Sequence, residues 1–248
     1  MNVYEETQLI LHKYKIQANK SLGQNFLVDD NVIDEIIRSS NINKQDLIIE
    51  IGPGLGVLTN RLLQETNNII AVELDKRMVN ILQDRFIINI NGQAESKLEI
   101  INEDVLKINL NEIIAEKRKQ TEIKNVKIVA NLPYYISTPI IMKLLENRLD
   151  IDEIIVMVQK EVAERLTAKT GTRLAGAITY AVEYYSDATG IIKVSKESFV
   201  PSPKVESEVI KLKVRKDKKI QVKDEKLLFN IISKSFMQRR KTLSNVLI

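Results

Sequence analysis

Cysteine is absent from the 248 residues, and histidine occurs once, at His12. Without cysteine the chain can form no disulfide, no thiolate zinc site and no cysteine nucleophile. His12 lies in a polar N-terminal stretch, which argues against a histidine-based metal centre or catalytic triad. We therefore expect no bound metal and a chemistry that needs neither a thiolate nor an imidazole.

Long apolar runs are also absent. No segment approaches the roughly 20 apolar residues that cross a membrane, and the N-terminus carries no apolar stretch of the signal-peptide type. We therefore expect a cytoplasmic protein with no membrane partner. Hydrophobic residues make up 44% of the chain, which suffices for one substantial core. The net charge of +4 suits a polyanionic partner such as nucleic acid.

Strand-like apolar runs alternate with amphipathic helical patterns in the first two thirds of the chain. Helical spacing between the runs indicates βαβ units, so we predict an α/β fold with a mainly parallel sheet and helices on both faces. Thr138 before Pro139 predicts an N-cap followed by proline at the first helical position. The predicted strands are Leu47–Ile51, Ile69–Leu74, Leu98–Ile101, Ile128–Ala130 and Ile154–Val158.

The pattern changes after residue 172. We predict a helix over Leu174–Tyr185 and then two extended stretches, Ile191–Val194 and Val205–Val214. The second stretch alternates in polarity, which predicts an antiparallel hairpin that closes one edge of the sheet. A charged linker leads to a last helix with an apolar face and Asp224 as its N-cap. We divide the chain into a domain of residues 1–218 and a small helical C-terminal domain of residues 219–248.

The stretch I-V-A-N-L-P-Y contains the strongest candidate for a reactive site. Its apolar strand places the amide of Asn131 at the strand end, and Pro133 stops the strand because it has no N–H to donate. Tyr134 adds a flat aromatic face directly afterwards. These groups could hold a planar base that carries an exocyclic amine. The alternative is a strand–turn–helix junction with a core tyrosine.

A glycine-rich turn follows the first strand in E-I-G-P-G-L-G, residues 50–56. Glycines allow the backbone to approach a ligand at the carboxyl edge of the sheet. The spacing G-x-G-x-G differs from the dinucleotide fingerprint G-x-G-x-x-G and favours a compact nucleoside such as S-adenosylmethionine. Glu73 ends the second strand, where a carboxylate can accept ribose hydroxyls, and Asp104 ends the third, near an adenine ring. The alternative is a tight turn with solvent-facing acids, but their register favours a nucleoside cofactor.

Six stretches of the chain resemble a single enzyme family. They are K-S-L-G-Q-N-F-L (20–27), E-I-G-P-G-L-G (50–56), N-L-P-Y (131–134), M-V-Q-K-E-V-A-E-R-L (157–166), S-F-V-P-S-P-K-V (198–205) and F-M-Q-R-R-K-T-L (236–243). The set resembles the S-adenosylmethionine-dependent rRNA adenine N6-dimethyltransferases, and among them the bacterial small-subunit type, the KsgA/RsmA family. It implies a Rossmann-like class I methyltransferase fold and dimethylation of two adjacent adenines in the 3′-terminal hairpin of 16S rRNA. The implied product is S-adenosylhomocysteine, and the implied partner is 16S rRNA within the pre-30S small ribosomal subunit. We expect the protein to act as a monomer.

The same resemblance implies roles for individual residues. Asn131 would bridge the cofactor and the target amine, Tyr134 would stack on the flipped adenine, and Phe199 would close its other face. The catalytic set would be Asn131, Leu132, Pro133, Tyr134 and Phe199. The cofactor-binding set would be Asn25, Leu27, Gly52, Gly54, Glu73, Leu74, Asp104, Val105 and Asn131. The RNA-binding set would be Lys20, Arg239, Arg240 and Lys241.

The sequence departs from the family pattern at two places, and three alternatives stay open. Relatives usually carry an aromatic near Ala175 and continue for a few helical turns beyond Ile248, so we expect different packing near Ala175 and an abbreviated or truncated C-terminal domain. One alternative is the macrolide-resistance type that methylates 23S rRNA, which shares Q-N-F and a related N-x-P-Y. The others are a ribosome-assembly factor that binds RNA without turnover, and a nicotinamide-dependent oxidoreductase, which the glycine spacing disfavours.

Overall fold

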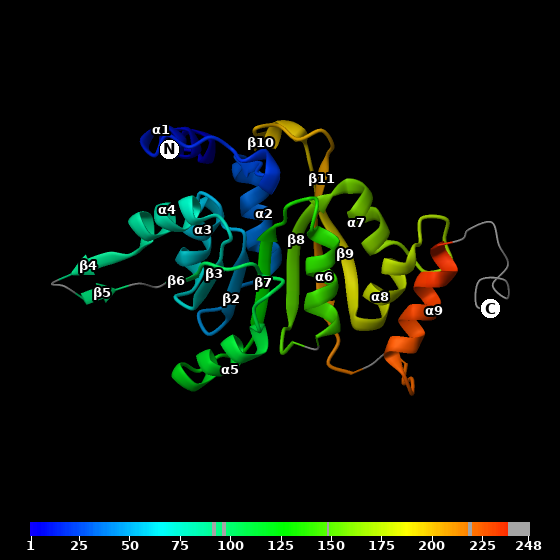
Figure 1. Cartoon of the computed structure of the whole chain (residues 1–248). Helices are drawn as coiled ribbons and strands as arrows, with labels where there is room; N and C mark the ends of the chain where they lie inside the picture. The colour runs from blue at the N-terminus through cyan, green and yellow to red at the C-terminus, as the bar shows by residue number, and fades with distance from the viewer. Residues whose placement is uncertain (91–92, 96–97, 148, 218–219, 238–248) are drawn as a thin grey trace.

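A seven-stranded sheet forms the centre of the protein (Figure 1). The structure, a computed structural model, describes residues 1–90, 93–95, 98–147, 149–217 and 220–237. Strands β6, β3, β2, β7 and β8 adjoin in that order and run parallel, and antiparallel β11 and β9 complete the sheet. Their bounds are β2 Leu47–Ile51, β3 Ile69–Val72, β6 Leu98–Ile101, β7 Val126–Asn131, β8 Glu153–Gln159, β9 Ser186–Val194 and β11 Ser207–Val214. The predicted parallel sheet with an antiparallel edge is confirmed.

The antiparallel edge differs from the prediction in its extent. Strand β9 begins at Ser186 rather than Ile191, and β11 begins at Ser207 rather than Val205. The first half of β9, S-D-A-T-G, is polar and carries no alternating pattern. It is nevertheless a strand because its backbone pairs with β11 from Ser186 opposite Val214 to Gly190 opposite Ile210. An edge strand can carry polar residues because one of its sides faces water.

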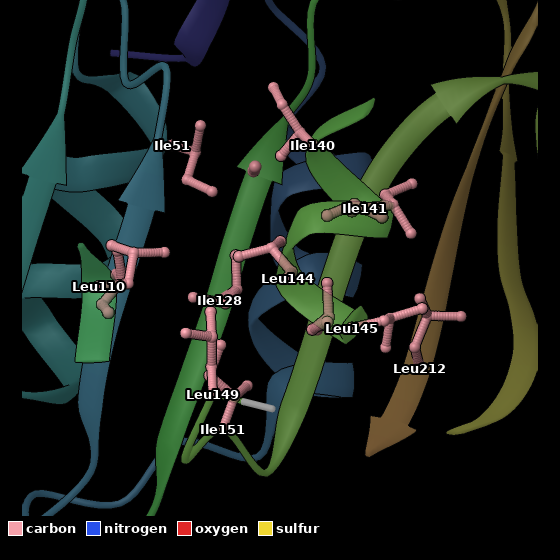
Figure 2. Packing of buried hydrophobic residues seen from close by; sticks show 14 of the residues in the cluster. Ile51, Leu110, Ile128, Ile140, Ile141, Leu144, Leu145, Leu149, Ile151 and Leu212 are labelled. Carbon is pink, nitrogen blue, oxygen red and sulfur yellow. The ribbon is translucent and has the colours of Figure 1, made fainter. Parts of the chain in front are cut away.

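Helices cover both faces of the sheet, as predicted. Alternate residues of β2 point to opposite faces: Ile49 and Ile51 join the apolar cluster beneath α6, whereas Ile48 joins the cluster beneath α2 and α3. Figure 2 shows the first of these clusters, where Leu144 of α6 packs against Ile128 of β7. One face carries α2 Asp30–Ser40 and α3 Val57–Glu65, and the other carries α5 Leu110–Gln120, α6 Ser137–Glu146, α7 Lys160–Thr167 and α8 Ala177–Tyr185.

The predicted start of α6 is wrong by two residues, and its predicted cap is wrong. The helix begins at Ser137, and its N-cap is Ile136, which provides no side-chain cap. The turn that follows the catalytic candidate sets this start, because the Ile136 N–H donates to the carbonyl of Pro133. Pro139 therefore lies in the first turn, where a missing N–H costs nothing since first-turn N–H groups have no partner within the helix.

The remaining elements surround the sheet. They are α1 Val3–Lys13, a 3-10 turn Lys20–Leu22 (η1), β1 Phe26–Leu27, α4 Lys76–Phe86, β4 Ile88–Ile90, β5 Gln93–Glu95, a 3-10 turn Lys196–Ser198 (η2), β10 Phe199–Val200 and α9 Glu225–Met237. The sequence analysis did not predict the β4–β5 pair or α7. No helix in the described ranges combines the length and apolar character that a membrane crossing needs.

The last helix, α9, packs on α8. The rings of Tyr180 and Phe236 lie 5.5 Å apart, and those of Tyr184 and Phe229 lie 5.4 Å apart. Asp224 accepts from the N–H of Leu227 at 2.9 Å, which confirms the predicted N-cap. The domain division at residue 218 stays a prediction. Ala175 is buried just before α8.

A buried ion pair ties the amino end of β7 to α2. The Lys127 ammonium lies 2.8 Å from the fully buried carboxylate of Asp46 and donates to the carbonyls of Ser40 and Asn41. Burial by itself raises the pKa of Asp46, but hydrogen bonds from Lys127, Asn43 and Asn125 outweigh it and hold the pKa below its usual range. The charged carboxylate thus stabilises the fold at neutral pH, and this contribution is lost as the pH falls through the folded pKa.

We expect Lys127→Met to lower the free energy of unfolding by about 3–5 kcal/mol, because it leaves the Asp46 carboxylate buried without its cation. The matched control is Lys117→Met, which breaks the more exposed pair with Glu99 and should cost about 0–1 kcal/mol. Urea unfolding of both variants measures the difference. Equal losses would show that the buried pair contributes no more than a surface one.

Candidate functional site

The carboxyl ends of four neighbouring parallel strands meet around one pocket. The chain order reverses between β2 and β7, and open α/β sheets bind ligands at such a switch point. Twelve of the residues predicted to bind cofactor or target base line this pocket: Asn25, Leu27, Gly52, Gly54, Glu73, Leu74, Asp104, Val105, Asn131, Leu132, Pro133 and Tyr134. The structure therefore brings together segments that lie far apart in the sequence. Asn25 and Asn131, for example, are 106 positions apart and are joined by a hydrogen bond.

The turn after β2 requires glycine for two reasons. Gly52 has φ +68°, a conformation that other residues rarely adopt. At Gly56 a Cβ atom would lie 2.6 Å from Phe86 Cε2 and 2.7 Å from Leu82 Cδ2, so only glycine lets this turn pack on α4. The turn consequently keeps its backbone close to the pocket.

Glu73 holds the turn in place from the end of β3. Its carboxylate is 7% exposed and accepts from the Gly54 N–H at 3.0 Å and from the Asp75 N–H at 2.8 Å. Burial raises the pKa of Glu73, and the two backbone N–H groups partly offset this. Each carboxylate oxygen accepts one backbone bond here and can accept another. Two such oxygens at a glycine turn fit the paired hydroxyls of a ribose, so the residues present fit a nucleoside cofactor.

The loop after β6 forms the next wall of the pocket. Asp104 uses one carboxylate oxygen to accept from the Leu106 N–H at 2.9 Å. The ammonium of Lys143, on α6, donates to the carbonyls of Val105 and Ile108, each at 2.9 Å. This lysine ties the Asp104 loop to the helix that follows the catalytic candidate.

Asn131 faces the pocket in a defined orientation. Its amide nitrogen donates to the carbonyl of Asn25 at 3.2 Å, so its oxygen remains as an acceptor. Beyond it, the hydroxyl of Tyr134 shares a 2.6 Å hydrogen bond with the buried hydroxyl of Ser207 on β11. Burial raises the pKa of Tyr134, and the bond to Ser207 partly offsets this. The phenol is therefore neutral, and the hydroxyl end of the ring is held by Ser207 on β11.

Two predicted residues lie outside the pocket lining, three lie outside the described residues, and one exposed ring was missed. Phe199 is 3% exposed, stands opposite Leu27 in the β1–β10 pair and packs in the core, away from the pocket lining. Lys20 is exposed at the start of η1. Arg239, Arg240 and Lys241 lie outside the described residues. Tyr135, which is 55% exposed, lines the pocket, and its only signal in the sequence was a second aromatic after Tyr134.

Glu50 is a second carboxyl group that the sequence analysis left without a role. It is 1% exposed, lines the pocket and accepts from the Thr59 hydroxyl at 2.6 Å. Burial raises the pKa of Glu50 to about 8, so the group is mostly neutral at pH 7. An acid inside an apolar strand was the signal that could have found it. Within the described ranges, no three His, Asp or Glu side chains are grouped as a metal site requires.

We expect Glu73→Ala to weaken binding of S-adenosylmethionine, in the absence of RNA, by about 1.5–3 kcal/mol, the value of a hydrogen bond to a charged group. Glu73→Gln should also weaken binding, because an amide NH₂ cannot accept a backbone N–H. Calorimetry measures both, with Glu65→Ala on the exposed end of α3 as the control. Unchanged affinity in both Glu73 variants would remove this residue from the site.

We expect the stability gained by Glu50→Gln to grow as the pH rises from about 5 to about 8. In the unfolded chain the carboxyl loses its proton near its ordinary pKa of 4.5, whereas the folded protein keeps it to about 8. The wild type therefore loses stability across this range, and the glutamine variant does not lose this component. Urea unfolding across the pH series measures the difference between the two proteins. A difference independent of pH would contradict a raised pKa.

Comparison with known proteins assigns the chain to a family. The sequence model described as "Ribosomal RNA adenine dimethylase" matches residues 15–248. A protein of Alkaliphilus oremlandii named "Ribosomal RNA small subunit methyltransferase A" is 44% identical over 243 residues, covering 98% of this chain and 82% of the relative. A protein of the same name from Lachnoclostridium phytofermentans is 45% identical, covering 97% of this chain and 80% of the relative.

Solved structures agree with the sequence relatives. A dimethyladenosine transferase from Plasmodium falciparum superposes with a TM-score of 0.72 at 30% identity, covering 89% of this chain and 74% of that one. The 23S rRNA methyltransferase ErmE superposes with a TM-score of 0.69 at 22% identity, covering 90% and 83%, and shows the fold alone. The predicted class I methyltransferase fold is thereby confirmed. Because the family model matches residues 15–248 and these relatives are 44% and 45% identical over nearly the whole chain, the chain belongs to the ribosomal RNA adenine dimethylase family.

Proposed function

We propose that the chain transfers methyl groups from S-adenosylmethionine to the N6 amines of two adjacent adenines in the 3′-terminal hairpin of 16S rRNA. The observation that carries this proposal is the orientation of Asn131, whose amide oxygen remains free as an acceptor in the pocket that Glu73 and Gly54 also line. The names of the relatives, which refer to the small ribosomal subunit, support the choice of substrate.

Asn131 and Leu132 act on the amine. An adenine amine is a poor nucleophile because its lone pair is delocalised into the ring. If the Asn131 side-chain oxygen and the Leu132 carbonyl accept the two N6 hydrogens, the nitrogen becomes tetrahedral and its lone pair is directed away from the ring. Bound S-adenosylmethionine supplies a methyl group on a positively charged sulfur, which leaves as a neutral thioether. The protein then contributes positioning and electrostatics, and the hydrogen that the new methyl group replaces leaves the amine as a proton to water, with no general base in the protein.

Tyr134 is the stacking surface for the flipped adenine in this proposal. Its hydroxyl is bonded to Ser207, which fixes the position of the hydroxyl end of the ring. Stacking on an aromatic side chain offsets the cost of leaving the RNA stack by about 1–3 kcal/mol per base. Phe199 is proposed to close the opposite face, and the β1–β10 pair would have to open for its buried ring to reach the base.

The setting of the reaction is proposed in the same way. A monomer acts in the cytoplasm on 16S rRNA within the pre-30S subunit. Lys20, exposed beside the pocket-lining segment, and the cluster Arg239, Arg240 and Lys241 are proposed to contact phosphates. The likeness to ErmE concerns the fold and gives no support to a 23S substrate. The Asn131 geometry favours turnover over a purely binding role in ribosome assembly.

The test supplies labelled S-adenosylmethionine with unmethylated 30S subunits and, separately, with protein-free 23S rRNA. We expect dimethyladenine in the 30S reaction alone, and methylation of 23S rRNA alone would overturn the proposal. Asn131→Ala should bind the subunit normally and lose about 100-fold in turnover, the scale of one preorganised hydrogen-bonding group. Asn67→Ala, an exposed asparagine far from the pocket lining, is the control. Near wild-type turnover in Asn131→Ala would remove Asn131 from the reaction.

A further inference from the structure

One N-terminal segment touches the loops that form the pocket. We call residues 19–27 the strap. The Asn25 carbonyl accepts from Asn131, and the ring of Phe26 lies against Gly54, where an added Cβ would be 3.5 Å away. At Gly23 an added Cβ would be 3.3 Å from the ring of Tyr135. The strap thus contacts both the glycine turn and the catalytic loop.

Gln24 is the residue that fastens the strap. Its side-chain oxygen accepts from the Asn19 N–H at 2.8 Å, and its own N–H donates to the Asn19 carbonyl at 3.2 Å, which closes the strap into a turn. The same amide donates through its nitrogen to Asp75 Oδ2 at 2.8 Å. The oxygen of the Gln24 amide thus accepts from an N–H group and its nitrogen donates to a carboxylate, so both polar atoms of the amide have a partner.

Asp75 is a fixed anchor for Gln24. It is 8% exposed, pairs with the Arg77 guanidinium at 2.6 Å and caps α4 by accepting from the Arg77 N–H at 3.0 Å. Its own N–H donates to the Glu73 carboxylate at 2.8 Å. A chain of hydrogen bonds therefore runs from Glu73 through Asp75 to Gln24, and the strap continues it to Asn131.

We propose that Gln24 is a positioning residue for methyl transfer, which rests on the proposed function of Asn131. By fastening the strap to Asp75, it holds the Asn25 carbonyl against the Asn131 amide nitrogen. That contact keeps the Asn131 oxygen available to the target amine. If the Asn131 amide were reversed, its NH₂ group would face the hydrogens of the target amine. Both groups are hydrogen-bond donors, so no hydrogen bond could form between them.

The fold does not depend on this fastening. The strap is also held by Phe26, which packs with Ile10 and Leu55, and by the β1–β10 pair, where Phe26 stands opposite Val200. Loss of the Gln24 bond therefore leaves the segment attached but less precisely placed. We therefore expect loss of this bond to change the affinity for the cofactor and the rate of turnover, but not the free energy of unfolding.

The test compares Gln24→Ala and Gln24→Glu with Gln45→Ala, which removes a partly exposed glutamine bonded to Glu122 at 3.2 Å. The glutamate variant can still accept from Asn19 but cannot donate to Asp75, and its charge repels that carboxylate, so it breaks the fastening with little change in side-chain size. We expect both Gln24 variants to keep the wild-type urea midpoint. We also expect the Kd for S-adenosylmethionine without RNA to rise about tenfold and kcat at saturating substrates to fall about tenfold, the scale of one charged hydrogen bond.

A double-mutant cycle tests the route through Asn131. If Gln24 acts by orienting that amide, Gln24→Ala should lower kcat much less in the Asn131→Ala background than in the wild type. Equal losses in both backgrounds, unchanged Kd and kcat in the Gln24 variants, or an equal fall in Gln45→Ala would each overturn the inference. A wild type that methylates no rRNA would instead refute the proposed function. The calorimetric arm would still show whether Gln24 fastens the strap over the cofactor site.

Discussion

The buried Glu73 carboxylate is the interaction on which the pocket depends. It accepts one N–H from the glycine turn at Gly54 and one from Asp75, so a single side chain sets the spacing of the loops after β2 and β3. Burial penalises its charge, and the two N–H groups offset part of that penalty. Asp75 in turn carries Gln24, which places the N-terminal segment. The loops after β2 and β3 are thereby connected through hydrogen bonds to the segment that contacts Asn131.

The two ends of the sheet treat buried charge differently. At the amino end of β7, Lys127 and Asp46 form an ion pair and are satisfied by backbone groups, which suits a role in stability. At the carboxyl end of β2, Glu50 has a hydroxyl for a partner and no cation, and burial keeps it neutral near pH 7. Glu73, the other buried acid at the pocket, accepts instead from two backbone N–H groups. We propose that it is also the acid that binds the ribose hydroxyls of the cofactor.

The spread of family motifs along the chain has a structural cause. The Q-N-F-L segment pairs with S-F-V-P-S-P-K through Leu27 opposite Phe199, and it contacts N-L-P-Y through the bond between Asn25 and Asn131. The hydroxyl of Tyr134 reaches Ser207 on the antiparallel edge. Segments at the start, middle and end of the chain thus contact one another beside the pocket.

The sequence by itself determined the parallel strands and the glycine turn, because apolar runs and turn chemistry are local signals and parallel strands end at one edge. The family resemblance in the sequence added further residues, so that twelve of the pocket-lining residues were predicted. The sequence could not show that β9 begins at polar Ser186, since pairing with a distant strand decides that. Tertiary structure alone decided that the Phe199 ring is buried, that the pKa of Glu50 is raised and that Gln24 meets Asp75. The physical reason is the same in each case: burial and hydrogen bonding depend on residues brought near only by the folded chain.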